Sequence, residues 1–174
     1  IATELDATAA LTTAGDVALS VALDVPPMGY RLANLDDANS AMAAMLAGEG
    51  VTVTGENIFG IEDNGGAVEL VVTDAPAEGG AKKLVYHPQQ YVLGVGCARN
   101  ADAEELWELV QKSLADAGIA HGAIACVATI DLKADEPAMN TVAKRLGVPL
   151  RLFTAAELEE QAVANPSDVV FAEV

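Results

Sequence analysis

Two short segments of the chain combine residue types that could bind an anion. Each follows an apolar run of strand length: the first is Gly94-Val-Gly-Cys-Ala-Arg99, and the second is Thr129-Ile-Asp-Leu-Lys-Ala-Asp-Glu136. In an open parallel sheet, ligands bind beyond the carboxyl ends of the strands. Gly94 and Gly96 let a ligand approach the backbone, and the N–H groups of Gly96 and Cys97 could bind its anionic group.

The charged residues of the two segments extend this hypothesis. If the two strands are parallel neighbours, Arg99 and Lys133 face the same edge of the sheet and form a carboxylate-binding pair. Asp131, Asp135 and Glu136 stand beside them. A plainer interpretation also stays open, in which Asp135 caps the next helix, Glu136 complements its dipole and Lys133 pairs with one of them. Charges next to a buried strand need partners, which favours a function for Asp131 and Lys133.

Alternating strands and helices after Gln89 predict the elements that position both segments. Strands are expected at 91–96, 123–130, 148–153 and 169–174, and helices at 100–118, 135–147 and 154–164. Asn100 or Asp102 caps the first helix, and a capping box opens the third. The apolar stripes of the first two helices are Leu106, Leu109, Val110 and Leu114, then Met139, Val142, Ala143 and Leu146. This pattern predicts an α/β fold, a three-layer α/β/α domain with a mainly parallel sheet over 90–174.

The residues before Gln89 predict a smaller α+β region. Apolar spacing indicates a helix over 35–47, and short strands are expected at 51–54, 67–73 and 84–86. The Asp63-Asn-Gly-Gly66 turn lies between the first two strands, so 58–73 is predicted to form a hairpin. A weak helix at 1–10 and a strand end or turn at 11–17 complete this part. The expected domains are therefore 1–25, the tail of a preceding unit, 26–89 and 90–174.

Composition limits the partners. The chain carries a formal charge of −17 over 174 residues, which argues against nucleic acid and anionic membranes. No apolar run reaches the roughly 18 residues of a membrane helix, and a soluble, cytoplasmic protein is expected. Cys97 and Cys126 lack metal-site or disulfide spacing, and the histidines are His87 and His121. No metal and no cofactor are therefore expected, while a cysteine–histidine nucleophile pair stays open.

Four motifs in order carry a family resemblance. They are Gly94-Val-Gly-Cys-Ala-Arg99 with Ala103-Glu-Glu-Leu106, Ala128-Thr-Ile-Asp-Leu-Lys-Ala-Asp-Glu-Pro137, Arg145-Leu-Gly-Val-Pro-Leu150 and Phe153-Thr-Ala-Ala-Glu-Leu158. Together they resemble the carboxy-terminal domain of the CbiG/CobE family, the cobalt-precorrin-5A hydrolases and their relatives. Leu11-Thr-Thr-Ala-Gly-Asp-Val17 resembles the end of that family's amino-terminal domain, and 29–74 is loosely similar to its central region. The chain therefore looks like a fragment or a truncated member, with 1–25 as the amino-terminal remnant.

The resemblance implies a role in cobalamin biosynthesis. The family hydrolase opens the ring lactone of cobalt-precorrin-5A and releases acetaldehyde, so the implied partner is a carboxylate-rich corrinoid precursor. Lactone hydrolysis needs an activated water and a stabilised oxyanion. Asp131 or Glu136 is the candidate base, and Lys133 or a backbone N–H is the candidate for the oxyanion. The implied substrate-binding residues are Gly94, Gly96, Cys97, Arg99, Lys133 and Asp135.

Other functions stay open at this point. The chain could be a non-catalytic, CobE-like module that holds the corrinoid intermediate or docks on neighbouring enzymes of the pathway. A nucleotide-binding α/β domain is a third alternative, although the glycines lack dinucleotide and P-loop spacing. The sequence also leaves the oligomeric state open, a homodimer included.

Overall fold

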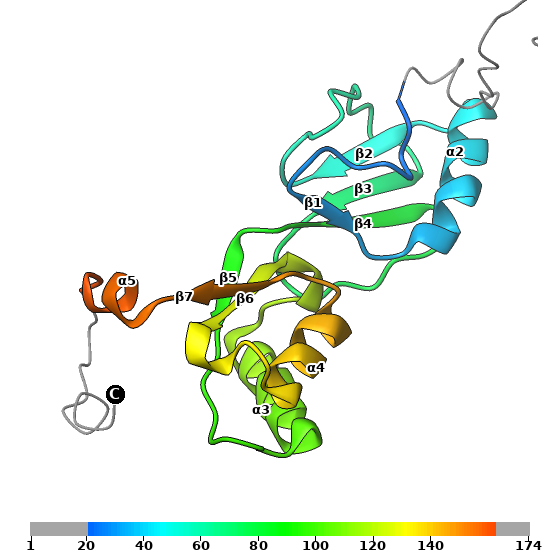
Figure 1. The fold of residues 1–174 in the computed structure, drawn as a ribbon. Helices are drawn as coiled ribbons and strands as arrows, with labels where there is room; N and C mark the ends of the chain where they lie inside the picture. Colours follow the sequence, from blue (N-terminus) through cyan, green and yellow to red (C-terminus); the bar gives the residue numbers. More distant parts are fainter. Residues whose placement is uncertain (1–20, 163–174) are drawn as a thin grey trace, which may run out of the picture. The chain divides into compact units, whose positions relative to one another are not determined.

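A computed structural model describes residues 21–162 of the chain. The fold divides into two compact units. Among the described residues, the first unit comprises 21–91 with 112–125, and the second comprises 92–111 with 126–162. Each unit contains one sheet, and both sheets are labelled in Figure 1.

The first unit is built on a four-stranded sheet. Its strands are β1 (Tyr30–Leu32), β2 (Val51–Thr54), β3 (Val68–Val72) and β4 (Lys83–Pro88), in the order β1-β4-β3-β2. β2, β3 and β4 run parallel, and β1 pairs antiparallel with β4. The 3-10 turn η2 (Leu35–Asp37) and helix α2 (Ala38–Leu46) connect β1 to β2 (Figure 1). The expected α+β region is therefore confirmed.

Small residues of α2 let the helix pack closely on this sheet. Ala38 and Ala41 are buried in one cluster with Leu84 and Tyr86 of β4, and the Phe59 ring packs edge-on against Tyr86. The Tyr86 hydroxyl donates a hydrogen bond to the Leu23 carbonyl at 2.8 Å, so its polar end is satisfied although the residue is fully buried. Burial raises the pKa of Tyr86 far above its usual range.

The hairpin predicted over 58–73 is wrong, because β2 and β3 pair in parallel. The chain returns to the start of β2 before β3 begins: Asn64 donates its N–H to the Val51 carbonyl at 3.0 Å, and its Oδ1 accepts the Val51 N–H at 2.7 Å. Gly50 and Gly66 then touch, since a Cβ on Gly66 would lie 1.8 Å from the Gly50 carbonyl carbon. The Asp63–Gly66 segment, which bends at Gly65, ends a crossover between parallel strands rather than forming the turn of a hairpin.

A second close contact joins a glycine of a short turn to a side chain of β4. The short turn η3 (His121–Ala123) lies against buried His87, whose Nδ1–H donates to the Thr73 carbonyl at 2.7 Å. A Cβ placed on Gly122 would stand 2.4 Å from His87 Cδ2. No side chain larger than hydrogen fits at position 122 without moving the imidazole ring.

Gly122→Ala is therefore expected to lower the free energy of unfolding by about 1–3 kcal/mol, the usual cost of overpacking a buried site. Gly80→Ala is the matched control, because nothing lies within 4 Å of the Cβ it would add. Its effect is expected to stay within about 1 kcal/mol. Urea denaturation followed by circular dichroism measures both. Equal stability of the two variants would contradict the contact with His87.

The second unit alternates strands and helices. β5 (Tyr91–Gly94), α3 (Ala103–Ala117), β6 (Ile124–Ile130), the 3-10 turn η4 (Asp131–Lys133), α4 (Pro137–Leu146), β7 (Leu150–Phe153) and α5 (Ala155–Glu159) follow in order. The sheet order is β5-β6-β7, and β6 and β7 are parallel. Arg145 of α4 binds Glu104 of α3 and stacks over Trp107, which places the two helices together (Figure 1). The predicted α/β class is confirmed.

Capping residues, a proline and a glycine mark the ends of the helices in this unit, as the sequence predicts. Asp102 Oδ1 accepts the N–H groups of Glu104 and Glu105, Pro137 opens α4, and Gly147 ends it with φ 65°. The Thr154–Glu157 capping box is present at α5. One expected core residue is wrong: Leu109 is 59% exposed, because the buried side of α3 follows Leu106, Val110 and Leu114.

Some expectations lie outside the described residues, namely the helix at 1–10, the strand end at 11–17 and the strand at 169–174. Within 21–162, no helix has the length and apolar content needed to cross a membrane.

Candidate functional site

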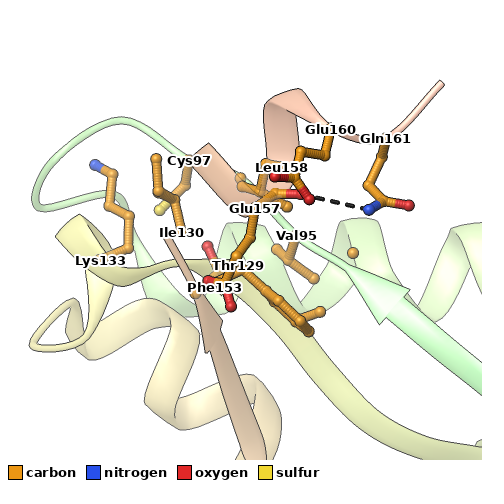
Figure 2. A pocket seen from close by; sticks show the side chains of 13 residues that line it. Val95, Cys97, Thr129, Ile130, Lys133, Phe153, Glu157, Leu158, Glu160 and Gln161 are labelled. Atoms are coloured by element: carbon orange, nitrogen blue, oxygen red, sulfur yellow. Dashed lines mark hydrogen bonds between the residues drawn. The ribbon is translucent and has the colours of Figure 1, made fainter. Parts of the chain in front are cut away.

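The ends of the three strands of the second unit surround a cavity of about 840 Å³. Its wall comes from the last residues of β5 and β6, the end of β7 and helix α5, with Lys133 of η4. Figure 2 shows Lys133 and Gln161 on opposite sides of this cavity. The lining residues are Gly94, Val95, Gly96, Cys97, Ala128, Thr129, Ile130, Lys133, Phe153, Glu157, Leu158, Glu160 and Gln161.

Apolar side chains form much of the wall. Phe153 is 38% exposed and Leu158 is 41% exposed, so both keep substantial apolar surface accessible to a ligand. Val95 and Ile130 lie with them around the cavity (Figure 2). A cavity of this size with an apolar wall and few polar groups is typical of sites for sizeable organic ligands.

The charged side chains of the wall differ in whether they already have hydrogen-bond or ion-pair partners. Glu157 Oε2 accepts the Thr154 N–H at 2.7 Å and the Thr154 hydroxyl at 2.8 Å, and these two bonds hold the pKa of the Glu157 carboxyl below its usual range. Lys133 is half-buried and forms no ion pair with any residue in 21–162. Lys133 is thus the basic residue of the wall that can bind an incoming anion.

The two polar segments predicted from the sequence do meet. The Val95 N–H donates to the Ala128 carbonyl at 2.9 Å, which joins the chain after β5 to β6. Further along, the Asn100 N–H donates to Glu136 Oε2 at 3.2 Å. The segments 94–100 and 129–136 therefore form one polar rim at the strand ends.

Cys97 lies on this rim and lines the cavity. Burial raises the pKa of its thiol, the negative charge of Glu136 raises it further, and the positive charge of Lys133 partly offsets both. A thiol with a raised pKa is mostly protonated near neutral pH and is a weak nucleophile. Cys97 is therefore suited to line the cavity rather than to attack a substrate.

The carboxy-terminal half of the chain matches a known family. Residues 91–174 fit the family described as "Cobalamin synthesis G C-terminus". This part of the chain is similar to that family. The match covers the whole cavity wall, because every lining residue lies between Gly94 and Gln161.

Two curated relatives also resemble part of this chain. Protein CobE of Sinorhizobium sp. is 47% identical over 83 residues, which are 47% of this chain and 54% of CobE. Cobalt-precorrin-5A hydrolase of Priestia megaterium is 31% identical over 88 residues, which are 51% of this chain and 24% of the hydrolase. The chain thus spans about half of CobE and about a quarter of the hydrolase.

A solved structure is also similar. It is described as a "putative cobalamin biosynthesis protein G homolog from Sulfolobus solfataricus" and is 16% identical, with a TM-score of 0.41 over 97% of this chain and 53% of that one.

The predicted site residues separate into two groups in this domain. Gly94, Gly96, Cys97 and Lys133 line the cavity. Arg99, Asp131 and Asp135 are exposed and outside its wall, while Glu136 is buried next to it. The expected pairing of Arg99 with Lys133 at one cavity is therefore not seen. Asp135 does not cap α4 either, because Glu136 occupies the N-cap position.

Sequence reasoning missed the contribution of the third strand end. Phe153, Glu157, Leu158, Glu160 and Gln161 complete the wall from β7 and α5. The rule that ligands bind beyond the ends of parallel strands applies to β7 as well as to β5 and β6. Applied to 148–153, it would have pointed to Phe153.

Proposed function

We propose that this chain serves cobalamin biosynthesis by binding a carboxylate-bearing corrinoid precursor in the cavity at the strand ends of its second unit. The observation that supports this function best is the composition of the wall. Partly exposed Phe153, Leu158 and Ile130 lie in it together with Lys133, whose ammonium has no ion pair within 21–162. A corrinoid precursor presents the matching chemistry, with a broad apolar macrocycle fringed by carboxylates. Apolar side chains would contact the ring, and Lys133 would bind one carboxylate.

The charge of the protein restricts how the anion is bound. At −17, the chain repels a polycarboxylate at long range. Attraction must therefore come from short contacts inside the cavity, namely Lys133 and the backbone N–H groups of Gly96 and Cys97. Charge-assisted hydrogen bonds in a partly dehydrated cavity are much stronger than contacts between exposed charges.

The similarity to cobalt-precorrin-5A hydrolase favours a second candidate function, hydrolysis of the ring lactone with release of acetaldehyde. The geometry supports binding better. A base must reach the attacking water, but the two predicted bases, exposed Asp131 and buried Glu136, lie outside the cavity wall. The carboxylates that do line it are Glu157, which is already bonded to Thr154, and Glu160.

We therefore expect the purified chain to bind cobalt-precorrin-5A without accelerating acetaldehyde release above the spontaneous rate. Acetaldehyde is measured by coupling its reduction to the oxidation of NADH, with a boiled sample of the same protein as the blank. Acetaldehyde release over several turnovers would contradict a purely binding function. A lower release rate in Asp131→Asn, Glu136→Gln or Glu160→Gln would then establish the hydrolase.

A further inference from the structure

Glu136 is the most completely buried carboxylate among the described residues, with 3% of its surface exposed. Its Oε2 accepts the N–H of Asn100 at 3.2 Å. Its Oε1 is also buried and has no hydrogen-bond partner within 21–162. A buried carboxylate with one oxygen unsatisfied costs folding free energy, so stability alone does not account for an acid at this position.

The partner of Glu136 is a strained backbone position. Asn100 has φ 57°, and among the described residues it is the one non-glycine in the left-handed region. Asparagine tolerates this conformation better than most residues, but it still disfavours it relative to the right-handed region. The bond from the Asn100 N–H to Glu136 thus holds the turn that carries the chain away from the cavity after Cys97.

The backbone of Glu136 fixes the other side of the rim. Its N–H donates to the Lys133 carbonyl at 3.0 Å, and its carbonyl accepts the Asn140 N–H at 3.2 Å and Asn140 Nδ2 at 3.0 Å. One residue is therefore bonded to the segment after β5, to η4 and to α4. These three contacts join the parts of the wall that carry Cys97 and Lys133.

We propose that Glu136 is a positioning residue, whose buried carboxylate holds the Gly96–Asn100 segment against η4 and so sets the spacing of Cys97 and Lys133 at the cavity. It acts on a ligand through these residues, because it does not itself line the cavity. The effect on corrinoid affinity rests on the proposed function, whereas the effect on the rim does not. The electrostatic influence of Glu136 on the Cys97 thiol agrees with their proximity.

Two variants separate the hydrogen bond from the charge. Glu136→Gln keeps an oxygen that can accept the Asn100 N–H and removes the negative charge, while Glu136→Ala removes both. Glu108→Gln is the control, since Glu108 is an exposed acid on α3 in the same unit. Thermal unfolding of each variant establishes that it is folded before the other measurements.

Alkylation of Cys97 by iodoacetamide, followed over pH by peptide mass spectrometry, reports on the rim without any corrinoid. The thiolate is the reacting form, so loss of the Glu136 charge is expected to move the pH midpoint downward in Glu136→Gln and Glu136→Ala. The limiting rate at high pH is expected to stay near the wild-type value in Glu136→Gln. In Glu136→Ala it should rise about threefold or more, because the segment loses its hydrogen bond and opens locally.

Titration with cobalt-precorrin-5A, followed by absorbance, then tests the consequence for binding. Glu136→Ala is expected to lower the affinity about tenfold, while Glu136→Gln stays within about threefold of wild type. The proposal is overturned if both variants match Glu108→Gln in the alkylation profile. It is also overturned if Glu136→Gln weakens binding as much as Glu136→Ala. If Glu136→Ala does not fold, Glu136→Asp takes its place, because its shorter side chain draws the carboxylate away from the Asn100 N–H, and its limiting alkylation rate is expected to rise as predicted for Glu136→Ala. Absence of corrinoid binding by the wild-type chain would refute the proposed function and leave the alkylation result as the test of positioning.

Discussion

Lys133→Ala is expected to weaken binding of cobalt-precorrin-5A by about tenfold to a hundredfold. Lys133 is half-buried in the cavity wall and has no ion pair among the described residues. A hydrogen bond to a charged group contributes about 1.5–3 kcal/mol, and about 1.4 kcal/mol corresponds to tenfold in affinity. Few other groups could compensate, because the chain is strongly acidic and the remaining charged side chains of the wall are Glu157 and Glu160.

Lys112→Ala is the matched control for this experiment. It removes one positive charge from an exposed lysine that pairs with Asp116 on α3, outside the cavity. Its effect on affinity is expected to stay within about twofold, since exposed ion pairs contribute little. Cobalamin, whose ring carboxylates are amidated, provides a ligand control that should be insensitive to Lys133→Ala. An equal loss in Lys112→Ala would show that net charge, and not a contact in the cavity, controls binding.

Met139→Ala is expected to lower the free energy of unfolding by about 2–5 kcal/mol, the usual cost of truncating a fully buried side chain. Met139 lies on α4 with none of its surface exposed, among Ala138, Val142 and Leu146. α4 begins beside Glu136 and η4, so the same variant should also weaken corrinoid binding at temperatures where the protein is partly unfolded. Guanidinium denaturation, monitored by circular dichroism, measures the change.

Lys144→Gln serves as the control on the same helix, because Lys144 is exposed. Its change is expected to remain below about 1 kcal/mol, the upper range for a charge at an exposed helix end. If Met139→Ala and Lys144→Gln had the same free energy of unfolding, the placement of Met139 in the core of the second unit would be contradicted.

Local signals in the sequence predicted most of the fold. The strand at 51–54, the capping box at Thr154 and the stop at Gly147 depend on a few neighbouring residues, and the structure confirms all three. The hairpin failed because pairing direction depends on where the connection returns. Here Asn64 and the contact of Gly50 with Gly66 bring the chain back to the start of β2. No turn residue by itself distinguishes a hairpin from such a crossover.

The candidate site could be predicted only in part, because the positions of several of its side chains depend on contacts between segments that are far apart in the sequence. The glycines and Lys133 follow strands that local patterns identify, and they do line the cavity. The outward positions of Arg99, Asp131 and Asp135 depend on how the segments fold after each strand, including the left-handed turn at Asn100. The burial of Glu136 depends on the tertiary contact with that turn, which sequence spacing does not encode.

The central claim is that a corrinoid precursor occupies the cavity at the strand ends, and protection of Cys97 tests it most directly. Cys97 lines the cavity, whereas Cys126 lies earlier on β6 and outside the lining, so the second cysteine is an internal control. Alkylation of both is followed by peptide mass spectrometry with and without saturating cobalt-precorrin-5A. The expected result is slower alkylation of Cys97, by about tenfold or more for an occluded thiol, with Cys126 unchanged. Unchanged alkylation of Cys97 at saturation would contradict the account.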